Sequence, residues 1–189
     1  MRLLLATRNP HKRREFARLL PGHEVAPLPK WVSLPPETGR SFAENALAKA
    51  RAVAQATGEP AIGDDSGIEA AALGGAPGIY SARFAGEGAD DAGNLAKLRR
   101  LAPVGSALRY VCAIAYADGG SRGERLFEGR CSGLMAAEAR GERGFGYDPV
   151  FVPDDHRDGR TMAELTDAEK DAISHRGRAA RRLLAWLDG

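Results

Sequence analysis

Hydrophobic residues in this chain gather either in short continuous runs or at the spacing of one helix face. The densest run, residues 107–117 with the sequence ALRYVCAIAYA, predicts a buried strand, as does the leucine-rich run at residues 2–7. In residues 41–57 the apolar positions recur three and four apart, which predicts an amphipathic helix. Strand and helix patterns therefore follow each other along the chain.

Shorter patterns predict the remaining elements. Strands are expected over residues 23–28, 60–63, 124–132 and 150–152, and helices over residues 11–20, 90–101 and the segment after 177. Two Ser/Thr-x-x-Glu patterns, Ser41 with Glu44 and Thr166 with Glu169, mark helix starts. The second helix contains Lys170, and residues 174–177 interrupt it.

Composition limits the class of protein. A length of 189 residues fits one domain, or one domain with a small lobe, and we assign residues 1–189 to a single domain. Hydrophobic residues at 43% and charged residues at 28% are typical of a soluble globular protein. No apolar run approaches the length of a membrane span, and the first residues do not form a signal peptide, so we expect no membrane partner.

Cysteine and charge content add two expectations. Cys112 and Cys131 lie among apolar or small residues without metal-ligand spacing, which predicts buried thiols and a cytoplasmic location. The net charge of +2 is too small to indicate a nucleic-acid partner. Basic residues do cluster at positions 8–18 and 170–182, where they form either solvated helix faces or anion sites.

The stretch at residues 60–86 carries the strongest chemical signal. Its short strand runs directly into Asp64 and Asp65, followed by Ser66, Gly67 and a glycine-rich turn. Carboxylates at the end of a strand form a platform for Mg²⁺, which takes oxygen ligands and bridges to phosphates. The alternative is an ordinary turn, because Asp, Ser and Gly are common turn residues.

Two further loops have features of a ligand site. Residues 7–12 connect a strand to a helix, and a helix N-terminus binds anions. Lys12 in that first turn opposes the helix dipole, so it is either a ligand contact or an exposed surface lysine. In the loop 140–148, Phe145 and Tyr147 lie between glycines, which suits stacking on a flat ring better than core packing.

Four blocks now stand in order along nearly the whole chain. They are Thr7-Arg8-Asn9-Pro10-His11-Lys12, then Asp64-Asp65-Ser66-Gly67 with GGAPGIYSARFAG, then Gly144-Phe145-Gly146-Tyr147-Asp148-Pro149, and Ser174-His175-Arg176-Gly177. Together they resemble the inosine triphosphate pyrophosphatase family, also described as Ham1-like proteins or dITP/XTP pyrophosphatases. The resemblance implies a mixed α/β fold with a strongly twisted central sheet, flanked by helices, and two lobes with an active-site cleft between them.

The same resemblance implies an activity. Members hydrolyse non-canonical purine nucleoside triphosphates such as ITP, dITP and XTP to the monophosphate and pyrophosphate, which keeps such bases out of DNA and RNA. They use Mg²⁺ and usually form homodimers. The resemblance implies Glu37 and Asp65 as metal ligands and Asp65 as the general base. The implied substrate-binding residues are Thr7, Arg8, Asn9, Pro10, His11, Lys12, Ser66, Phe145, Gly146, Tyr147, Asp148, Lys170, His175 and Arg176.

Two departures from the family pattern and two rival functions stay open. Position 8 is Arg where many members have Gly, and position 71 is Ala where an acid or amide is usual. One rival is a non-catalytic nucleotide- or RNA-binding module, although Glu37, Asp64 and Asp65 would repel phosphate without a metal. The other is a pyrophosphatase for a different nucleotide class, such as dUTP or dCTP.

Overall fold

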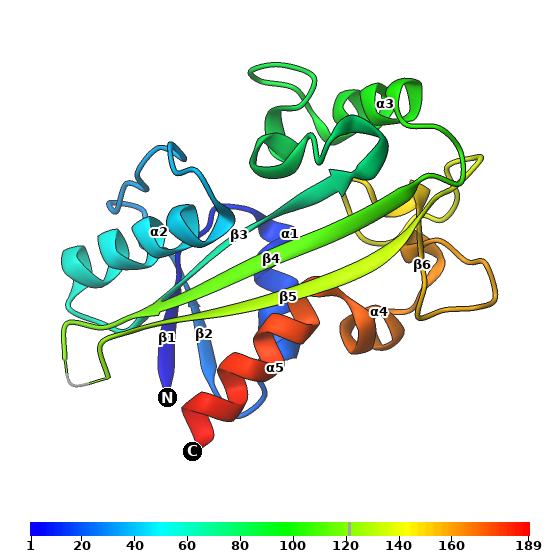
Figure 1. Cartoon of the computed structure of the whole chain (residues 1–189). Helices are drawn as coiled ribbons and strands as arrows, with labels where there is room; N and C mark the ends of the chain where they lie inside the picture. The colour runs from blue at the N-terminus through cyan, green and yellow to red at the C-terminus, as the bar shows by residue number, and fades with distance from the viewer. Residues whose placement is uncertain (121) are drawn as a thin grey trace. The chain divides into compact units, whose positions relative to one another are not determined.

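The computed structural model describes residues 1–120 and 122–189 (Figure 1). Its strands are β1 (Arg2–Leu5), β2 (Glu24–Pro27), β3 (Ala61–Ala70), β4 (Ala107–Ala117), β5 (Glu124–Met135) and β6 (Phe151–Pro153). Its α-helices are α1 (Pro10–Leu19), α2 (Phe42–Thr57), α3 (Asp91–Leu101), α4 (Asp167–Ile173) and α5 (His175–Asp188). Short 3-10 helices occupy Ala71–Leu73, Gly78–Arg83, Asp148–Val150 and Met162–Glu164.

The strands form a mixed sheet in the order β2-β1-β3-β4-β5-β6. Strand β1 pairs in parallel with β2, Leu3 lying opposite Val25, and in parallel with β3, Leu5 lying opposite Ile62. Strand β5 pairs antiparallel with β6. This mixed sheet with its helices confirms the predicted α/β fold class.

The chain divides into two compact units. The first contains Met1–Asp65, Cys112–Gly129 and Arg176–Gly189, and the second contains Ser66–Val111 and Arg130–His175. The peptide chain crosses from one unit to the other within β3, β4 and β5 and at the start of α5. The assignment of residues 1–189 to a single domain and the expected cleft both stay predictions.

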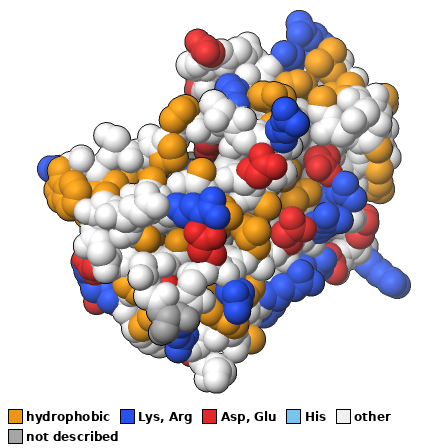
Figure 2. Space-filling model, turned by 60° about the vertical axis from the view of Figure 1, so that its left-hand side comes forward, with side chains coloured by type: hydrophobic (Ala, Val, Ile, Leu, Met, Phe, Trp, Pro, Cys, Tyr) orange, Lys and Arg blue, Asp and Glu red, His pale blue; other side chains and the backbone are white. Residues whose placement is uncertain are grey.

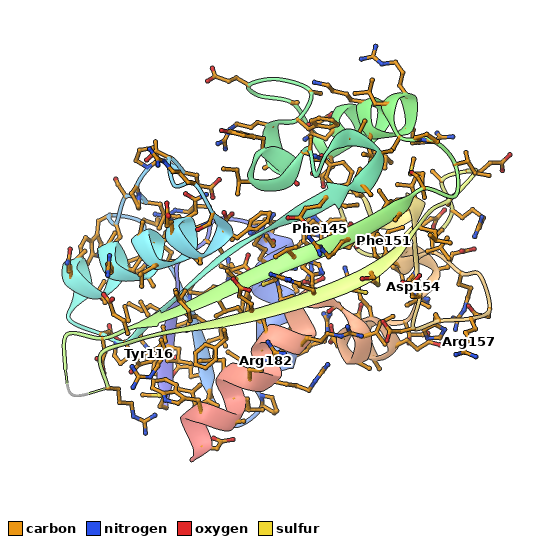
Figure 3. The ribbon with its side chains drawn as sticks, in the orientation of Figure 1. Tyr116, Phe145, Phe151, Asp154, Arg157 and Arg182 are labelled. Carbon is orange, nitrogen blue, oxygen red and sulfur yellow. The ribbon has the colours of Figure 1, made fainter. Side chains whose placement is uncertain are left out.

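The first unit has a core formed by strands and two helices. Leucines of β1 and the apolar face of α5 pack together with Phe16, Leu19 and Leu20 from α1 and its end. Tyr116 of β4 lies against Trp186 of α5, with ring centroids 4.8 Å apart (Figure 3). Ile62 of β3 also belongs to this core, so the next residue, Gly63, faces the opposite side of the strand.

Helix α2 packs closely on that opposite side of β3. Ser41 caps its start by accepting a hydrogen bond from the Glu44 N–H, and Gly58 ends it with φ of +71°, as the sequence predicts. At Gly63 an added Cβ would lie 2.1 Å from the Ala46 carbonyl oxygen. Only glycine therefore allows the helix backbone to approach the strand this closely.

Replacing Gly63 with alanine should destabilise the protein by about 3 kcal/mol, the upper end of the usual cost of overpacking. The added methyl group meets helix backbone, which cannot move aside as a flexible side chain would. Urea unfolding measures the change. Gly119→Ala is the matched control, because no atom of the described residues beyond its chain neighbours lies within 4 Å of a Cβ there. An equal loss in both variants would contradict the close approach.

The second unit has a separate core. It gathers Ile68 of β3, Leu98 of α3, Tyr110 of β4 and Cys131 of β5, all of them buried. Phe151 of β6 packs against Tyr110, with ring centroids 4.6 Å apart (Figure 3). Both cysteines are buried free thiols, Cys112 in the first unit and Cys131 in the second, as the sequence predicts.

The structure corrects two predicted boundaries. The strand expected over residues 60–63 does not end at Asp64 and Asp65, because β3 continues through both to Ala70. Both carboxylates are buried but ion-paired, and this pairing allows acidic residues inside a buried strand. The expected interruption at 174–177 is also shorter, since Ser174 ends α4 and α5 already begins at His175.

Candidate functional site

The loop before α1 uses its polar side chains to hold the start of the helix. Asn9 is the N-cap, and its side-chain oxygen accepts the N–H groups of His11 at 2.8 Å and Lys12 at 3.3 Å. The Thr7 hydroxyl accepts the Asn9 N–H at 3.2 Å. Pro10, in the first turn, has no N–H to satisfy. Asn9 therefore already uses two of the N–H groups that the sequence assigned to an anion.

Asp64 is the centre of a buried network of charges in the first unit. Its carboxylate lies 2.5 Å from the Lys12 ammonium and accepts hydrogen bonds from two nitrogens of Arg176. Arg176 also donates to Glu15 of α1 at 2.5 Å, and the Cys112 thiol donates to Asp64 at 3.1 Å. All the charged groups but Lys12 are nearly inaccessible, so each carboxylate is compensated by a cation inside the unit.

The network fixes the charge of Asp64. Burial alone would raise the pKa of this carboxyl, but Arg176 and Lys12 together hold it well below its usual value. Near neutral pH Asp64 is therefore an anion that positions two cations, and it is poorly suited to accept a proton.

Asp65 has different partners and a different character. The Asn45 side-chain amide donates to one of its oxygens at 2.9 Å, and the Lys49 ammonium lies 3.5 Å from the other. Lys49 also donates to Glu37 at 2.8 Å and to the Asp64 carbonyl at 2.6 Å. The predicted metal ligands Glu37 and Asp65 thus share one lysine.

Asn45 and Lys49 contact the predicted site residues Asp65 and Glu37, but neither is among the residues predicted from the sequence. They lie four positions apart on α2, and both are buried although polar, with exposed fractions of 2% and 5%. Residues at this spacing share one helix face. The sequence did contain a signal for them. Both polar residues lie next to Ala46 and Ala50, which belong to the apolar face of a predicted helix.

The pKa of Asp65 is raised, in contrast to that of Asp64. Burial is the largest cause and the neighbouring Glu37 adds to it, while Lys49 opposes both. Burial would lower the pKa of Lys49, but Asp65 and Glu37 raise it overall, so the lysine keeps its charge. Lys49 serves two acids at once, and Asp65 is therefore left only partly compensated. A carboxylate in this state is a better proton acceptor than Asp64.

The donor set around Asp65 fits a magnesium ion completed by substrate. Glu37 and Asp65 supply carboxylate oxygens, and Mg²⁺ is commonly held by one or two carboxylates together with phosphate oxygens and waters. Among residues 1–120 and 122–189, no three His, Cys, Asp or Glu residues gather as a metal-binding group.

In the second unit Asp148 ties the loop at residues 144–148 to its surroundings. One oxygen accepts the Tyr110 hydroxyl at 3.0 Å. The other accepts the Lys170 ammonium at 2.6 Å and the Phe145 N–H at 3.0 Å. The carboxylate is 3% exposed, so a strand, a helix and the loop meet at one buried anion.

The loop itself is held in a defined shape. Gly144 has φ of +73°, and a Cβ there would lie 2.0 Å from the Asp148 carboxylate. The Gly146 N–H donates to Asp91 at 2.9 Å, and the Tyr147 hydroxyl donates to the Ser81 carbonyl at 2.7 Å. Tyr147 is buried and packs in the core, so the expectation that it suits ring stacking better than core packing is wrong for this residue. Phe145 is the more accessible of the two aromatic rings.

The other predicted residues of this unit lie on neighbouring elements. Thr166 and Glu169 form the predicted capping box at the start of α4, the helix that carries Lys170. The Lys170 ammonium lies 5.1 Å from the centroid of the Phe145 ring. His175 stacks on Tyr110 with centroids 4.5 Å apart and planes 6° apart, and Ser66 is a half-buried residue of β3.

The structure therefore brings the predicted residues together as two groups. The first unit contains Thr7, Arg8, Asn9, Pro10, His11, Lys12, Glu37, Asp65 and Arg176. The second contains Ser66, Phe145, Gly146, Tyr147, Asp148, Lys170 and His175. Arg176 and His175 are neighbours in sequence but belong to different groups.

Comparison with known proteins supplies the family. The model of the Ham1 family matches residues 3–186, nearly the whole chain. The chain belongs to the Ham1 family. It is 48% identical to the dITP/XTP pyrophosphatase of Mycolicibacterium paratuberculosis, over 98% of this chain and 95% of that protein. It is 42% identical to the dITP/XTP pyrophosphatase of Bacillus subtilis, over 98% of this chain and 96% of that protein.

Solved structures of the Ham1 family share the fold. A HAM1 protein from Coxiella burnetii matches with a TM-score of 0.86 and 39% identity, over 100% of this chain and 98% of that one. The Staphylococcus aureus Ham1 protein also gives a TM-score of 0.86, with 37% identity over 100% of this chain and 99% of that one.

The structure accounts for one of the two departures from the Ham1 pattern. The Arg8 guanidinium donates hydrogen bonds to the carbonyls of Leu28, Pro29, Lys30 and Val32 at 2.8–3.2 Å. Its side chain thus ties the residue 7–12 loop to the segment that follows β2. The second departure, Ala71, is an exposed residue at the start of a 3-10 helix, and nothing in the structure explains it.

Proposed function

We propose that this Ham1 family protein hydrolyses non-canonical purine nucleoside triphosphates, namely ITP, dITP and XTP, to the monophosphate and pyrophosphate. It thereby removes these nucleotides from the pool used for DNA and RNA synthesis. The observation that carries the proposal is the state of Asp65, a buried carboxylate with a raised pKa, held by Asn45 and placed beside Lys49 and Glu37. The relatives named dITP/XTP pyrophosphatase support the choice of substrate.

Asp65 is the proposed general base. It accepts a proton from a water molecule whose oxygen forms a bond to the α-phosphorus, while the bond from that phosphorus to the bridging oxygen breaks and pyrophosphate leaves. Asn45 fixes the orientation of the carboxylate, and the raised pKa brings it closer to the value that suits a base near neutral pH. Asp64, held charged by Arg176 and Lys12, supports the site without exchanging protons.

The phosphates are proposed to bind the loop at residues 7–12 and the two lysines. Lys12 and Lys49 are compact cations suited to phosphate, and both are now neutralised by carboxylates. Glu37 and Asp65 would hold Mg²⁺. When bound, the ion would neutralise phosphate charge, lower the pKa of water and help to orient it.

The purine base is proposed to bind the residue 144–148 loop. Phe145 offers a ring for stacking, and selectivity for a 6-oxo group requires hydrogen-bond donors. The N–H groups of Phe145 and Gly146 already donate to Asp148 and Asp91, so Lys170 and His175 are the proposed donors. Ser66 stays a proposed substrate contact on the strand that carries Asp65.

Three further proposals concern partners and location. Acidic side chains are interspersed with the basic ones on the face drawn in Figure 2, which supports the proposal that nucleic acid is not a partner.

No described helix is long and apolar enough to cross a membrane. We also propose a cytoplasmic homodimer, which sedimentation would detect as about twice the chain mass of 20.1 kDa.

The test is pyrophosphate release from the purified protein with Mg²⁺, using ITP, dITP, XTP, GTP, ATP and dUTP at equal concentration. We expect kcat/KM for the first three to exceed that for ATP by at least about a hundredfold, because donors placed for a 6-oxo group are left unpaired against the 6-amino group of ATP. A chelator should abolish turnover and added Mg²⁺ should restore it. Tight nucleotide binding without turnover would instead indicate a binding module, and preference for dUTP would indicate another nucleotide class.

A further inference from the structure

Tyr110 contacts two proposed base-binding residues at once. It lies on β4 with an exposed fraction of 6%, and its hydroxyl donates to Asp148 at 3.0 Å. Its ring stacks on His175, with centroids 4.5 Å apart and planes only 6° apart. One buried side chain therefore meets the residue 144–148 loop through its polar end and the first residue of α5 through its face.

The hydroxyl acts on the loop through Asp148. That carboxylate accepts three hydrogen bonds, from Tyr110, from the Lys170 ammonium and from the Phe145 N–H. Lys170 and Phe145 are themselves proposed to contact the base. The Lys170 ammonium lies over the Phe145 ring, 5.1 Å from its centroid. Loss of the tyrosine hydroxyl would leave one oxygen of a buried carboxylate without this donor, and such a group then reorients or recruits water.

We propose that Tyr110 is a positioning residue that fixes the residue 144–148 loop, the base loop, relative to His175. It thereby sets the preference for 6-oxo purines. The inference rests on the proposed function. Tyr110 does not touch the substrate. It holds Asp148, and through it Lys170 and Phe145, in a fixed relation to the His175 ring, so that the donors and the stacking ring reach one base together.

The chain contains a matched control on the same strand. Tyr116 is also buried in β4, and its hydroxyl also donates to an aspartate, Asp118, at 3.0 Å. It belongs to the first unit, where it packs against Trp186. Tyr116→Phe therefore removes a hydroxyl that also donates to an aspartate, from the same strand but in the first unit, although its hydrogen bond is only partly buried.

The experiment compares Tyr110→Phe, Tyr110→Leu and Tyr116→Phe with the unaltered protein, with Mg²⁺ present. Tyr110→Phe should lower kcat/KM for ITP about tenfold through KM, with kcat nearly unchanged, as expected for one hydrogen bond to a charged group. Tyr110→Leu, which also loses the stack on His175, should lower it about a hundredfold and narrow the preference for ITP over ATP. Tyr116→Phe should leave both quantities unchanged.

Product inhibition separates positioning from general loss of structure. Inosine monophosphate should inhibit Tyr110→Phe about tenfold more weakly, whereas inorganic pyrophosphate should inhibit it as it does the unaltered protein. An active parent enzyme with Tyr110→Phe indistinguishable from Tyr116→Phe overturns this inference alone. Equal weakening of inhibition by inosine monophosphate and by pyrophosphate also overturns the inference. If the unaltered protein hydrolyses no purine triphosphate, the proposed function and the inference about Tyr110 are both overturned.

Discussion

Asp65→Asn should lower kcat for ITP by about a thousandfold while the protein still binds nucleotide. The change keeps the shape of the side chain but removes its ability to accept a proton, and general-base catalysis contributes about a hundredfold to ten-thousandfold. The amide can still accept the hydrogen bond from Asn45, so the fold should persist. Steady-state kinetics and nucleotide titration measure the two quantities separately.

The control for Asp65→Asn is Glu69→Gln on the same strand. Glu69 is also an ion-paired acid of β3, with Arg109 as its partner, but it lies outside the proposed site. Glu69→Gln should leave kcat within twofold of the unaltered value. Full activity in Asp65→Asn would remove Asp65 from the catalytic role, and equal losses in both variants would point to a general effect on the strand.

Arg176→Met should lower the free energy of unfolding by about 3–5 kcal/mol, the usual cost of breaking a buried ion pair from one side. The substitution leaves Asp64 and Glu15 buried without the guanidinium that joins them. For a chain of this length the melting temperature should fall by about 10 °C. The control is Arg182→Met on the same helix (Figure 3). Arg182 is exposed and donates to the Glu128 carbonyl.

The same variant should change how stability depends on pH. The folded pKa of Asp64 is depressed, so its contribution is present above the unfolded pKa, about 3.9, and is lost as the pH falls through the lower folded value. The unaltered protein should therefore lose stability below about pH 4. In Arg176→Met this acid-side slope should be smaller, and an unchanged slope would contradict the assigned partner.

Local patterns predicted most of the elements, because their signals lie within a few residues. The apolar run at residues 107–117 coincides with β4, and Ser41 and Gly58 bound α2 as expected. Pairings between distant residues were not predictable in this way. Asp64 could be placed inside a strand only with knowledge of Arg176, which lies 112 positions further along the chain.

The candidate site was predicted as residue types rather than as an arrangement. The family resemblance supplied Glu37 and Asp65, but only the fold shows that Lys49 lies between them. It also shows that the side chain of Arg8 donates hydrogen bonds to the backbone carbonyls of Leu28 and Val32. A side chain with several donors can satisfy many alternative acceptors, and the choice depends on a loop about twenty residues away in sequence.

The two buried cysteines provide built-in reporters of local opening. Each unit contains one thiol, and burial together with the nearby Asp64 raises the pKa of Cys112 well above its usual value. A thiol in this state reacts with alkylating reagents only when its surroundings open. In Cys112→Ala and Cys131→Ala variants, the labelling rate of the remaining cysteine therefore measures how often one unit opens, and nucleotides that protect one unit can be told from those that protect the other.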